Sequence, residues 1–336
     1  MKHFLDITTH ASAEARINAT SKHSLVIYSP TSLRRLKNVR GKGVFVSAHE
    51  VGKDAAKIEE LCARLDIDTV IGFGGGTAID IAKYIAYILQ SKFICMPTIL
   101  STNAFATNKV ALIKNGAKVT LDAKMADEII LDTDLVATAG TQNLYGLCDI
   151  LSIHTALHDW RLADSAGVEK IDSSIYRMSQ NLLHNATTFA LGLTAPNTLD
   201  IPSLFSMIGE SGHITNIYGS GRPESGSEHI FAKELELMTD IPHGISIASG
   251  ITLMSHLQDN YSADIQAALR RIGVMSDIAD RYDVRRSIVA SLEGIRPRMD
   301  RYTILDEKTP SLDLSSRLTD SLYDEILGVS NEYSHH

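Results

Sequence analysis

The sequence is poor in cysteine and has no dense block of positive charge. Its three cysteines, Cys62, Cys95 and Cys148, lie far apart and form no CxxC pair, which argues against a disulfide framework or a thiolate zinc site. No run of Lys and Arg reaches five residues, and the net charge is −8. A nucleic-acid surface needs a basic stripe to displace counterions from phosphates, so no nucleic-acid partner is expected. A small anionic substrate fits this composition, because a few local cations can hold one phosphate.

Long apolar runs are also missing. No stretch approaches the ~18 consecutive apolar residues of a membrane span, and the first ten residues lack the apolar core of a secretory signal. We therefore expect no membrane association and a cytoplasmic location. What is present is a globular composition, with 44% hydrophobic and 21% charged residues, which argues against disorder. At roughly 100–200 residues per domain, the 336 residues suggest two domains.

The first ~140 residues alternate short β-branched runs with helical spacing. We expect strands at 24–28, 43–47, 69–73, 93–96 and 128–131, helices at 53–65 and 77–89, and a hairpin over 110–121 around Asn115-Gly116. This alternation is typical of a parallel sheet covered on both faces. After about residue 135 helical spacing dominates. We therefore predict an α/β domain over 1–137 and an all-α domain over 138–336.

A glycine turn follows the third expected strand and opens a helix. Gly74, Gly75 and Gly76 let the backbone turn sharply and expose N–H groups, while the helix N-terminus favours a phosphate. The run is neither GxGxxG nor GxxxxGK[ST], so a phosphate cradle and a simple tight turn both remain open. Asp80, one turn into the helix, could bond near the turn or pair with Lys83.

The segment 96–109, MPTILSTNAFATNK, follows the fourth expected strand and is rich in hydroxyl and amide side chains. Ligands of open α/β sheets lie beyond the carboxyl ends of the strands, where this loop and the glycine turn both fall. It is either an ordinary loop or the second wall of a nucleotide site.

One carboxylate and two imidazoles stand out in the helical half: Asp149, His229 and His243. Such a set suits Zn²⁺ or Fe²⁺ and leaves coordination positions open for a substrate oxygen. Spacing alone supports it weakly, because 13 histidines are present. His154 and His158, at i and i+4 on one helix face, form a rival pair without an evident third ligand.

Several motifs together resemble one known family. GFGGGTAIDIAK, MPTILSTNAFAT, LYGLCDILSIHTALHDWRLA, SGRPESGSEH, PHG and RPRMDRYTILD occur in the order seen in sn-glycerol-1-phosphate dehydrogenases, and they span residues 70 to 306. These enzymes belong to the dehydroquinate synthase-like and iron-containing alcohol dehydrogenases. The resemblance implies a dehydroquinate synthase-like fold, with an α/β N-terminal dinucleotide-binding domain, an all-α C-terminal domain, and metal and substrate between them.

The resemblance also implies roles for individual residues. The cofactor, NAD or NADP, would have its pyrophosphate along Gly74, Gly75, Gly76 and Asp80, with Thr98, Ser101 and Thr107 along its nicotinamide half. One divalent metal, with zinc expected and iron or nickel as alternatives, would be held by Asp149, His229 and His243. The implied reaction is reduction of dihydroxyacetone phosphate or a related small phosphorylated ketone.

Two positions expected to face the substrate depart from the family pattern. Asn103 stands where an Asp is usual, and Lys233 stands where a His is usual, one turn beyond His229. With Asp149 they are our candidate catalytic residues, and Lys109, Arg222 and Lys233 are candidate anion contacts. The departures keep two alternatives open: a cyclase or lyase that uses NAD without net turnover, and a nucleotide-binding protein without chemistry. Arg34, Arg35 and Lys37 could accept the 2′-phosphate of NADP, and a homo-oligomer is possible.

Overall fold

The structure is a computed structural model that describes residues 13–194, 199–274, 285–297 and 301–327. The chain forms two compact units. Unit 1 comprises residues 1–143 and 199–216, and unit 2 comprises 144–198 and 217–336. Within the described part, no helix is long and apolar enough to cross a membrane.

Unit 1 is built on a five-stranded sheet in which every neighbouring pair is parallel. Its order is β2 (Val44–Ser47), β1 (Ser24–Tyr28), β3 (Thr69–Gly74), β4 (Lys92–Pro97) and β7 (Glu128–Ile129). Val26 pairs with Ile71, which pairs with Ile94, and all three belong to the unit's core. Strands buried on both faces explain the continuous apolar runs. The predicted parallel sheet is confirmed.

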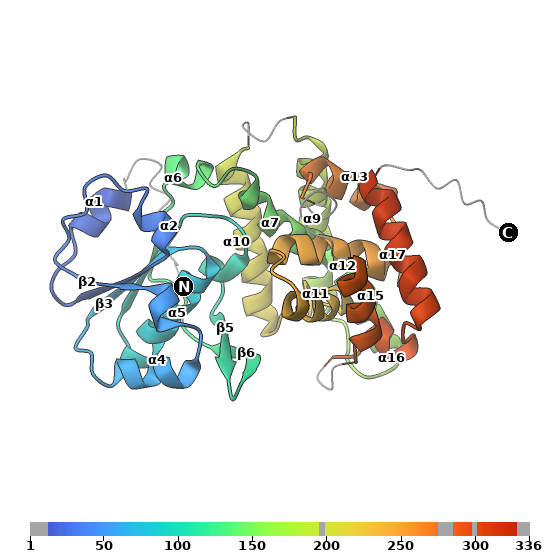
Figure 1. The fold of residues 1–336 in the computed structure, drawn as a ribbon, viewed down its shortest axis with the longest axis horizontal. Coiled ribbons are helices and arrows are strands. Elements are labelled where there is room, and N and C mark those ends of the chain that lie inside the picture. The colour runs from blue at the N-terminus through green and yellow to red at the C-terminus, as the bar shows by residue number, and fades with distance from the viewer. Residues whose placement is uncertain (1–12, 195–198, 275–284, 298–300, 328–336) are drawn as a thin grey trace. The chain divides into compact units, whose positions relative to one another are not determined.

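The helices that unit 1 forms before residue 144 precede, connect or follow these strands (Figure 1). They are α1 (Ala13–Asn18), α2 (Pro30–Leu33), α3 (Ala48–Val51), α4 (Ala55–Cys62), α5 (Gly76–Leu89) and α6 (Thr133–Ala137), with the 3-10 turns η1 (Asn103–Ala106) and η2 (Gly140–Leu144). β5 (Lys109–Lys114) and β6 (Ala117–Asp122) pair antiparallel. Asn115 and Gly116 have φ of 54° and 76°, the left-handed pair that a two-residue hairpin turn requires, so the predicted hairpin is confirmed.

Unit 1 extends past the predicted boundary at 137/138. The Asn143 side chain accepts a hydrogen bond from the Leu100 N–H at 2.9 Å and donates one to the Val136 carbonyl at 2.9 Å. Both partners belong to unit 1, so Asn143 packs with this unit. Much later in the sequence, α10 (Ile201–Tyr218) returns to this unit. Phe205 stacks on Phe105 with ring centroids 4.5 Å apart. The sequence prediction placed this helix in the second domain because its helical spacing matches its neighbours along the chain.

Unit 2 contains no strand in its described residues. Its helices are α7 (Tyr145–Leu151), α8 (Ile153–Ser165), α9 (Ser173–Leu191), α11 (Ser227–Met238), α12 (His243–Leu257), α13 (Ala263–Ile272), α15 (Arg285–Gly294), α16 (Ile304–Glu307) and α17 (Leu312–Leu327). Every residue from Gly244 to Ser255 in α12 is buried, as expected of a helix at the centre of a bundle. Gly250 brings α12 close to α11, because a Cβ there would lie 2.7 Å from the Glu228 carbonyl oxygen.

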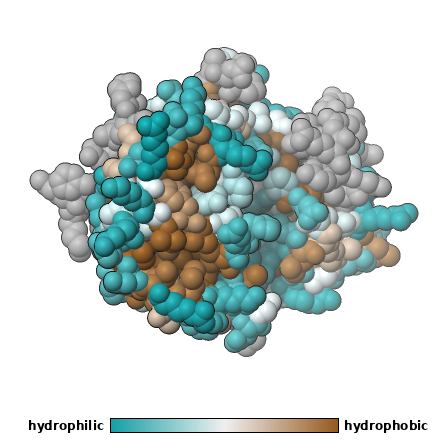
Figure 2. Space-filling model, turned by 60° about the vertical axis from the view of Figure 1, so that its left-hand side comes forward, coloured by the Kyte–Doolittle hydropathy of each residue, from teal (hydrophilic) through white to brown (hydrophobic). Residues whose placement is uncertain are grey.

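Part of the surface is apolar. Figure 2 shows hydrophobic residues gathered in a patch that is bordered by hydrophilic ones. The described large apolar side chains of unit 1 that are exposed are Val39, Val44, Tyr87 and Ile113. Since nothing here identifies a covering partner, the homo-oligomer stays a prediction.

Candidate functional site

The glycine turn joins β3 to α5 through backbone that side chains would obstruct. Gly74 has φ +158°, and a Cβ there would lie 2.7 Å from Ser29 Oγ. A Cβ on Gly76 would lie 3.1 Å from Thr102 Oγ1. The 14-residue helix α5 begins at this bare turn and directs its N–H groups and positive dipole end toward it. The turn therefore fits a phosphate-bearing ligand.

A cavity of about 380 Å³ lies against this turn, within unit 1. Its walls include Gly75, Gly76 and Thr98, and the Thr98 hydroxyl is 2.7 Å from Ser32 Oγ. Its volume lies within the range of small-molecule sites, about 300–1,000 Å³. The carboxyl ends of β1, β3 and β4 meet here, the edge where open parallel sheets bind ligands.

The other predicted cofactor residues do not line this cavity: Gly74, Asp80, Ser101 and Thr107. Two of them make internal contacts. The Ala111 N–H donates to Asp80 Oδ2 at 3.2 Å, and Lys83 Nζ lies 3.3 Å from Thr107 Oγ1. Both side chains are buried and secure the loop and hairpin that follow β4.

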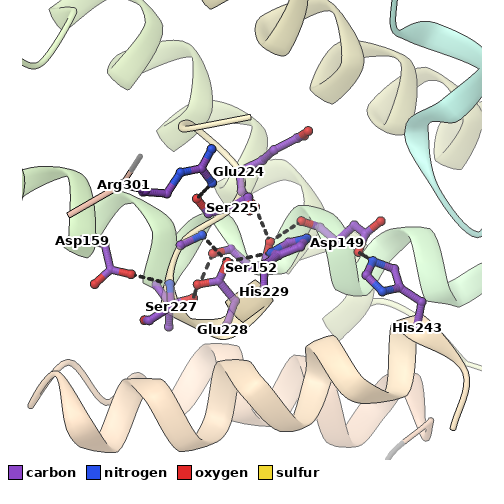
Figure 3. Close-up of polar contacts among 12 residues, drawn as sticks. Asp149, Ser152, Asp159, Glu224, Ser225, Ser227, Glu228, His229, His243 and Arg301 are labelled. Carbon is purple, nitrogen blue, oxygen red and sulfur yellow. Dashed lines mark hydrogen bonds and ion pairs between the residues drawn. The ribbon is translucent and has the colours of Figure 1, made fainter. Parts of the chain in front are cut away.

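In unit 2, the three predicted metal ligands come together (Figure 3). Asp149 lies in α7, His229 in the first turn of α11, and His243 begins α12. One ligand atom from each lies within 4.8 Å of the other two, and no other group of three such side chains was found among the described residues. Asp149 Oδ1 is buried without a hydrogen-bond partner and lies 3.4 Å from His243 Nε2. A buried carboxylate oxygen facing two imidazoles is a donor set that a divalent cation satisfies.

A carboxylate orients each imidazole. His229 Nδ1 is 2.8 Å from Glu228 Oε1, and His243 Nδ1 is 2.6 Å from Glu236 Oε1. A carboxylate on Nδ1 fixes the tautomer that leaves the Nε2 lone pair for a metal. Neither glutamate was singled out from the sequence. Glu228 immediately precedes His229, and Glu236, seven residues after His229, lies on the same face of α11.

The site concentrates negative charge. Burial alone would lower the pKa of His243, but Asp149 and Glu236 raise it to about 10. Burial alone would raise the pKa of Glu228, but hydrogen bonds from His229, the Gly226 N–H and the Thr155 hydroxyl lower it below its ordinary value. Glu228 thus stays ionised although its side chain is fully buried. These carboxylates suit the binding of a cation.

The start of α11 is anchored by a buried aspartate that sequence reasoning also missed. Asp159 accepts hydrogen bonds from the backbone N–H groups of Ser227 at 2.6 Å and Ile304 at 2.8 Å. Gly226 makes this approach possible, because a Cβ there would lie 2.4 Å from Asp159 Oδ2. Burial, followed by the nearby Glu228, raises the pKa of Asp159 to about 6.

The remaining candidates differ in how much they are engaged. Lys109 forms an ion pair with Asp122. Arg222 is buried, with Nε 3.2 Å from Glu169 Oε2. These two cations are occupied by the protein itself.

Lys233 is half-buried and has no hydrogen bond or ion pair with the described residues. Asn103 starts η1 in unit 1, and its Nδ2 donates to Ser211 Oγ at 3.2 Å. Of the rival pair, His154 Nε2 lies 2.7 Å from the Asn260 carbonyl oxygen, and no third ligand joins it and His158 among the described residues.

Comparison with known proteins gives one family. A family model described as iron-containing alcohol dehydrogenase matches residues 31–140. The glycerol-1-phosphate dehydrogenase, NAD(P)+, of Sulfolobus acidocaldarius is 31% identical over 84% of this chain and 81% of its own length. The glycerol-1-phosphate dehydrogenase of Thermoplasma volcanium is 31% identical over 76% of this chain and 74% of its own length. The chain belongs to the glycerol-1-phosphate dehydrogenase family.

The chain is therefore an NAD(P)-dependent dehydrogenase of this family, and Asp149, His229 and His243 are its candidate site for a divalent metal. Solved structures agree on the fold. A probable glycerol dehydrogenase from Sinorhizobium meliloti has a TM-score of 0.68 at 18% identity, covering 94% of both chains. An iron-containing alcohol dehydrogenase from Thermococcus thioreducens has a TM-score of 0.60 at 14% identity, covering 89% of this chain and 92% of its own. The predicted family and fold class are confirmed.

Proposed function

We propose that this enzyme reduces dihydroxyacetone phosphate, or a closely related small phosphorylated ketone, with NAD(P)H. The observation that carries the proposal is the meeting of Asp149, His229 and His243 within 4.8 Å, with a carboxylate on each imidazole. The relatives are glycerol-1-phosphate dehydrogenases, which supports the substrate class. Asp149, His229 and His243 would hold the metal, and zinc suits one oxygen and two nitrogen donors with an open position.

A divalent ion held by Asp149, His229 and His243 would supply a Lewis acid toward the substrate carbonyl. The protein supplies position. Glu228 and Glu236 hold the imidazoles by Nδ1, and the glycine turn with Thr98 holds the cofactor. Asp80 and Thr107 do not line the cavity. Their buried side chains stabilise the loop and hairpin that follow β4. Asn103, a neutral amide, can donate to a substrate oxygen but cannot take up a hydroxyl proton as an aspartate would.

Lys233 is the cation that we assign to the substrate phosphate. It lies one helical turn after His229 and has no partner among the described residues. We expect Lys233→Met to raise KM for dihydroxyacetone phosphate about tenfold with a smaller change in kcat, because a charge-assisted contact to the bound phosphate is lost. Steady-state kinetics on dihydroxyacetone phosphate and on free dihydroxyacetone measure this. Lys57→Met, on the exposed side of α4, is the control, and an equal loss on both substrates would contradict the assignment.

Glu236 is a positioning residue for His243. Glu236→Gln keeps the shape but removes the charge behind Nδ1, so we expect metal affinity to fall about 10–100-fold. Competition with a chelator, followed by metal analysis, measures it without any turnover. Glu234→Gln, on the same helix, is the control, and unchanged affinity in the Glu236 variant would refute the role.

The function is tested by metal analysis of purified enzyme combined with a reductase screen. Phosphorylated and free ketoses are offered with NADH and NADPH, and absorbance is followed at 340 nm. Steady loss of absorbance with dihydroxyacetone phosphate supports the proposal. Product formation without that loss would indicate the cyclase or lyase alternative, and neither signal would indicate a nucleotide-binding protein without chemistry.

A further inference from the structure

We propose that this enzyme prefers NADPH to NADH, and that Arg35 recognises the 2′-phosphate that distinguishes the two. The inference rests on the proposed use of the unit 1 cavity as the cofactor site. It adds a preference between NADPH and NADH and names Arg35 as the residue responsible. The glycine turn alone does not distinguish the two cofactors.

The walls of that cavity differ in chemistry. Gly75, Gly76 and Thr98 bring backbone N–H groups and a hydroxyl, which suit a pyrophosphate. Arg35 and His49, from the segments that follow β1 and β2, also line it. One continuous cavity therefore has the glycine turn, an arginine and a histidine among its walls.

No Asp or Glu is among the residues that line this cavity. Selectivity for NAD ordinarily depends on an acidic side chain that accepts hydrogen bonds from the ribose hydroxyls, and the same carboxylate repels a 2′-phosphate. An arginine in that region instead accommodates the phosphate, since its planar guanidinium can form two parallel hydrogen bonds to phosphate oxygens. The lining thus lacks the carboxylate that favours NADH and contains an arginine, Arg35, that favours NADPH.

The other basic residues of this segment are placed differently. Arg34 Nε donates to the Pro30 carbonyl at 3.2 Å, and neither Arg34 nor Lys37 lines the cavity. The Arg35 guanidinium is exposed and has no hydrogen bond or ion pair with the part of the chain that the structure describes. Of the three cations that the sequence offered for a 2′-phosphate, Arg35 is therefore the one available at the cavity.

The adjacent arginines provide a matched experiment. NADPH and NADH are titrated into the metal-loaded enzyme without substrate, and binding is followed by nicotinamide fluorescence, so that the readout is independent of turnover. We expect the unmodified enzyme to bind NADPH about tenfold more tightly than NADH. Arg35→Glu should raise the Kd for NADPH at least about tenfold while leaving that for NADH within about twofold, because it places a carboxylate opposite the phosphate. Arg34→Glu should leave the preference intact.

The salt dependence gives an independent check. A contact between an exposed guanidinium and a doubly charged phosphate is screened by salt, so the advantage of NADPH should shrink between 50 mM and 500 mM salt in the unmodified enzyme and not in Arg35→Glu. Equal affinity for both nucleotides in the unmodified enzyme, or an equal loss for both in Arg35→Glu, would overturn the inference while leaving the cofactor site in place. Binding of neither nucleotide would overturn the proposed function as well.

Discussion

Alanine at His229 or at His243 should remove the bound metal and the reductase activity while leaving nucleotide affinity nearly unchanged. Each substitution deletes one of three donors and leaves Asp149 Oδ1, already buried without a hydrogen bond, facing a site with a single imidazole. Two remaining ligands bind a divalent ion far more weakly than three, and without the ion the site would lack its Lewis acid toward the substrate carbonyl. We expect kcat/KM to fall by about 10³ or more, the loss seen when a main electrostatic contribution is removed.

The measurement is metal content by elemental analysis, paired with NADPH titration of the same samples. His158→Ala is the matched control, since it belongs to the rival histidine pair, and it should retain metal and most activity. Metal content that is unchanged in both the His229 and His243 variants would refute the site. Loss in His158→Ala instead would move it to α8.

The sheet of unit 1 could be predicted because the apolar runs in its sequence match the burial of its strands in the fold. A strand buried on both faces has to be apolar at nearly every position. The strands that contain Leu25–Ile27 and Val70–Ile71 can therefore be predicted from the sequence alone. The hairpin was legible for a similar reason, since Asn115-Gly116 is the dipeptide that tolerates two left-handed residues in succession.

The three metal ligands could be predicted only from the order of the family motifs along the chain. Spacing alone left Asp149, His229 and His243 as one choice among 13 histidines, because the ligands come from three separate helices. The Nδ1 partners were missed because a glutamate beside a histidine is common, and only the fold shows which pairs face each other. The placement of α10 in unit 1 depends on packing such as Phe105 on Phe205, which leaves no trace in periodicity.

Lys83 illustrates the same limit, because its i,i+3 spacing from Asp80 also fits a solvated surface pair. In the structure its side chain has no solvent exposure. Its Nζ donates to the carbonyls of Ala104 at 2.5 Å and Lys109 at 2.8 Å, and lies 3.9 Å from Asp80 Oδ1. One buried cation therefore joins α5 to the η1 turn that carries Asn103 and to the start of β5.

We expect Lys83→Met to lower the free energy of unfolding by about 3–5 kcal/mol, the cost of leaving one member of a buried ion pair without its partner. Urea unfolding measures it, and Lys57→Met should change stability by less than about 0.5 kcal/mol. Burial already raises the pKa of Asp80, and the nearby Lys83 charge opposes that rise. Without that charge the pKa rises further, so the carboxylate becomes neutral at higher pH and the deficit of Lys83→Met should shrink as pH falls through this raised pKa.

The double variant Asp80→Asn/Lys83→Met separates charge from packing. With both charges gone, no buried ion is left unpaired, so we expect the double variant to be more stable than Lys83→Met alone. If it is less stable, and the deficit does not change with pH, then the lysine acts through its hydrogen bonds to the loop carbonyls. In that case the geometry of the Asn103 segment depends on those bonds, whatever charge lies beside them.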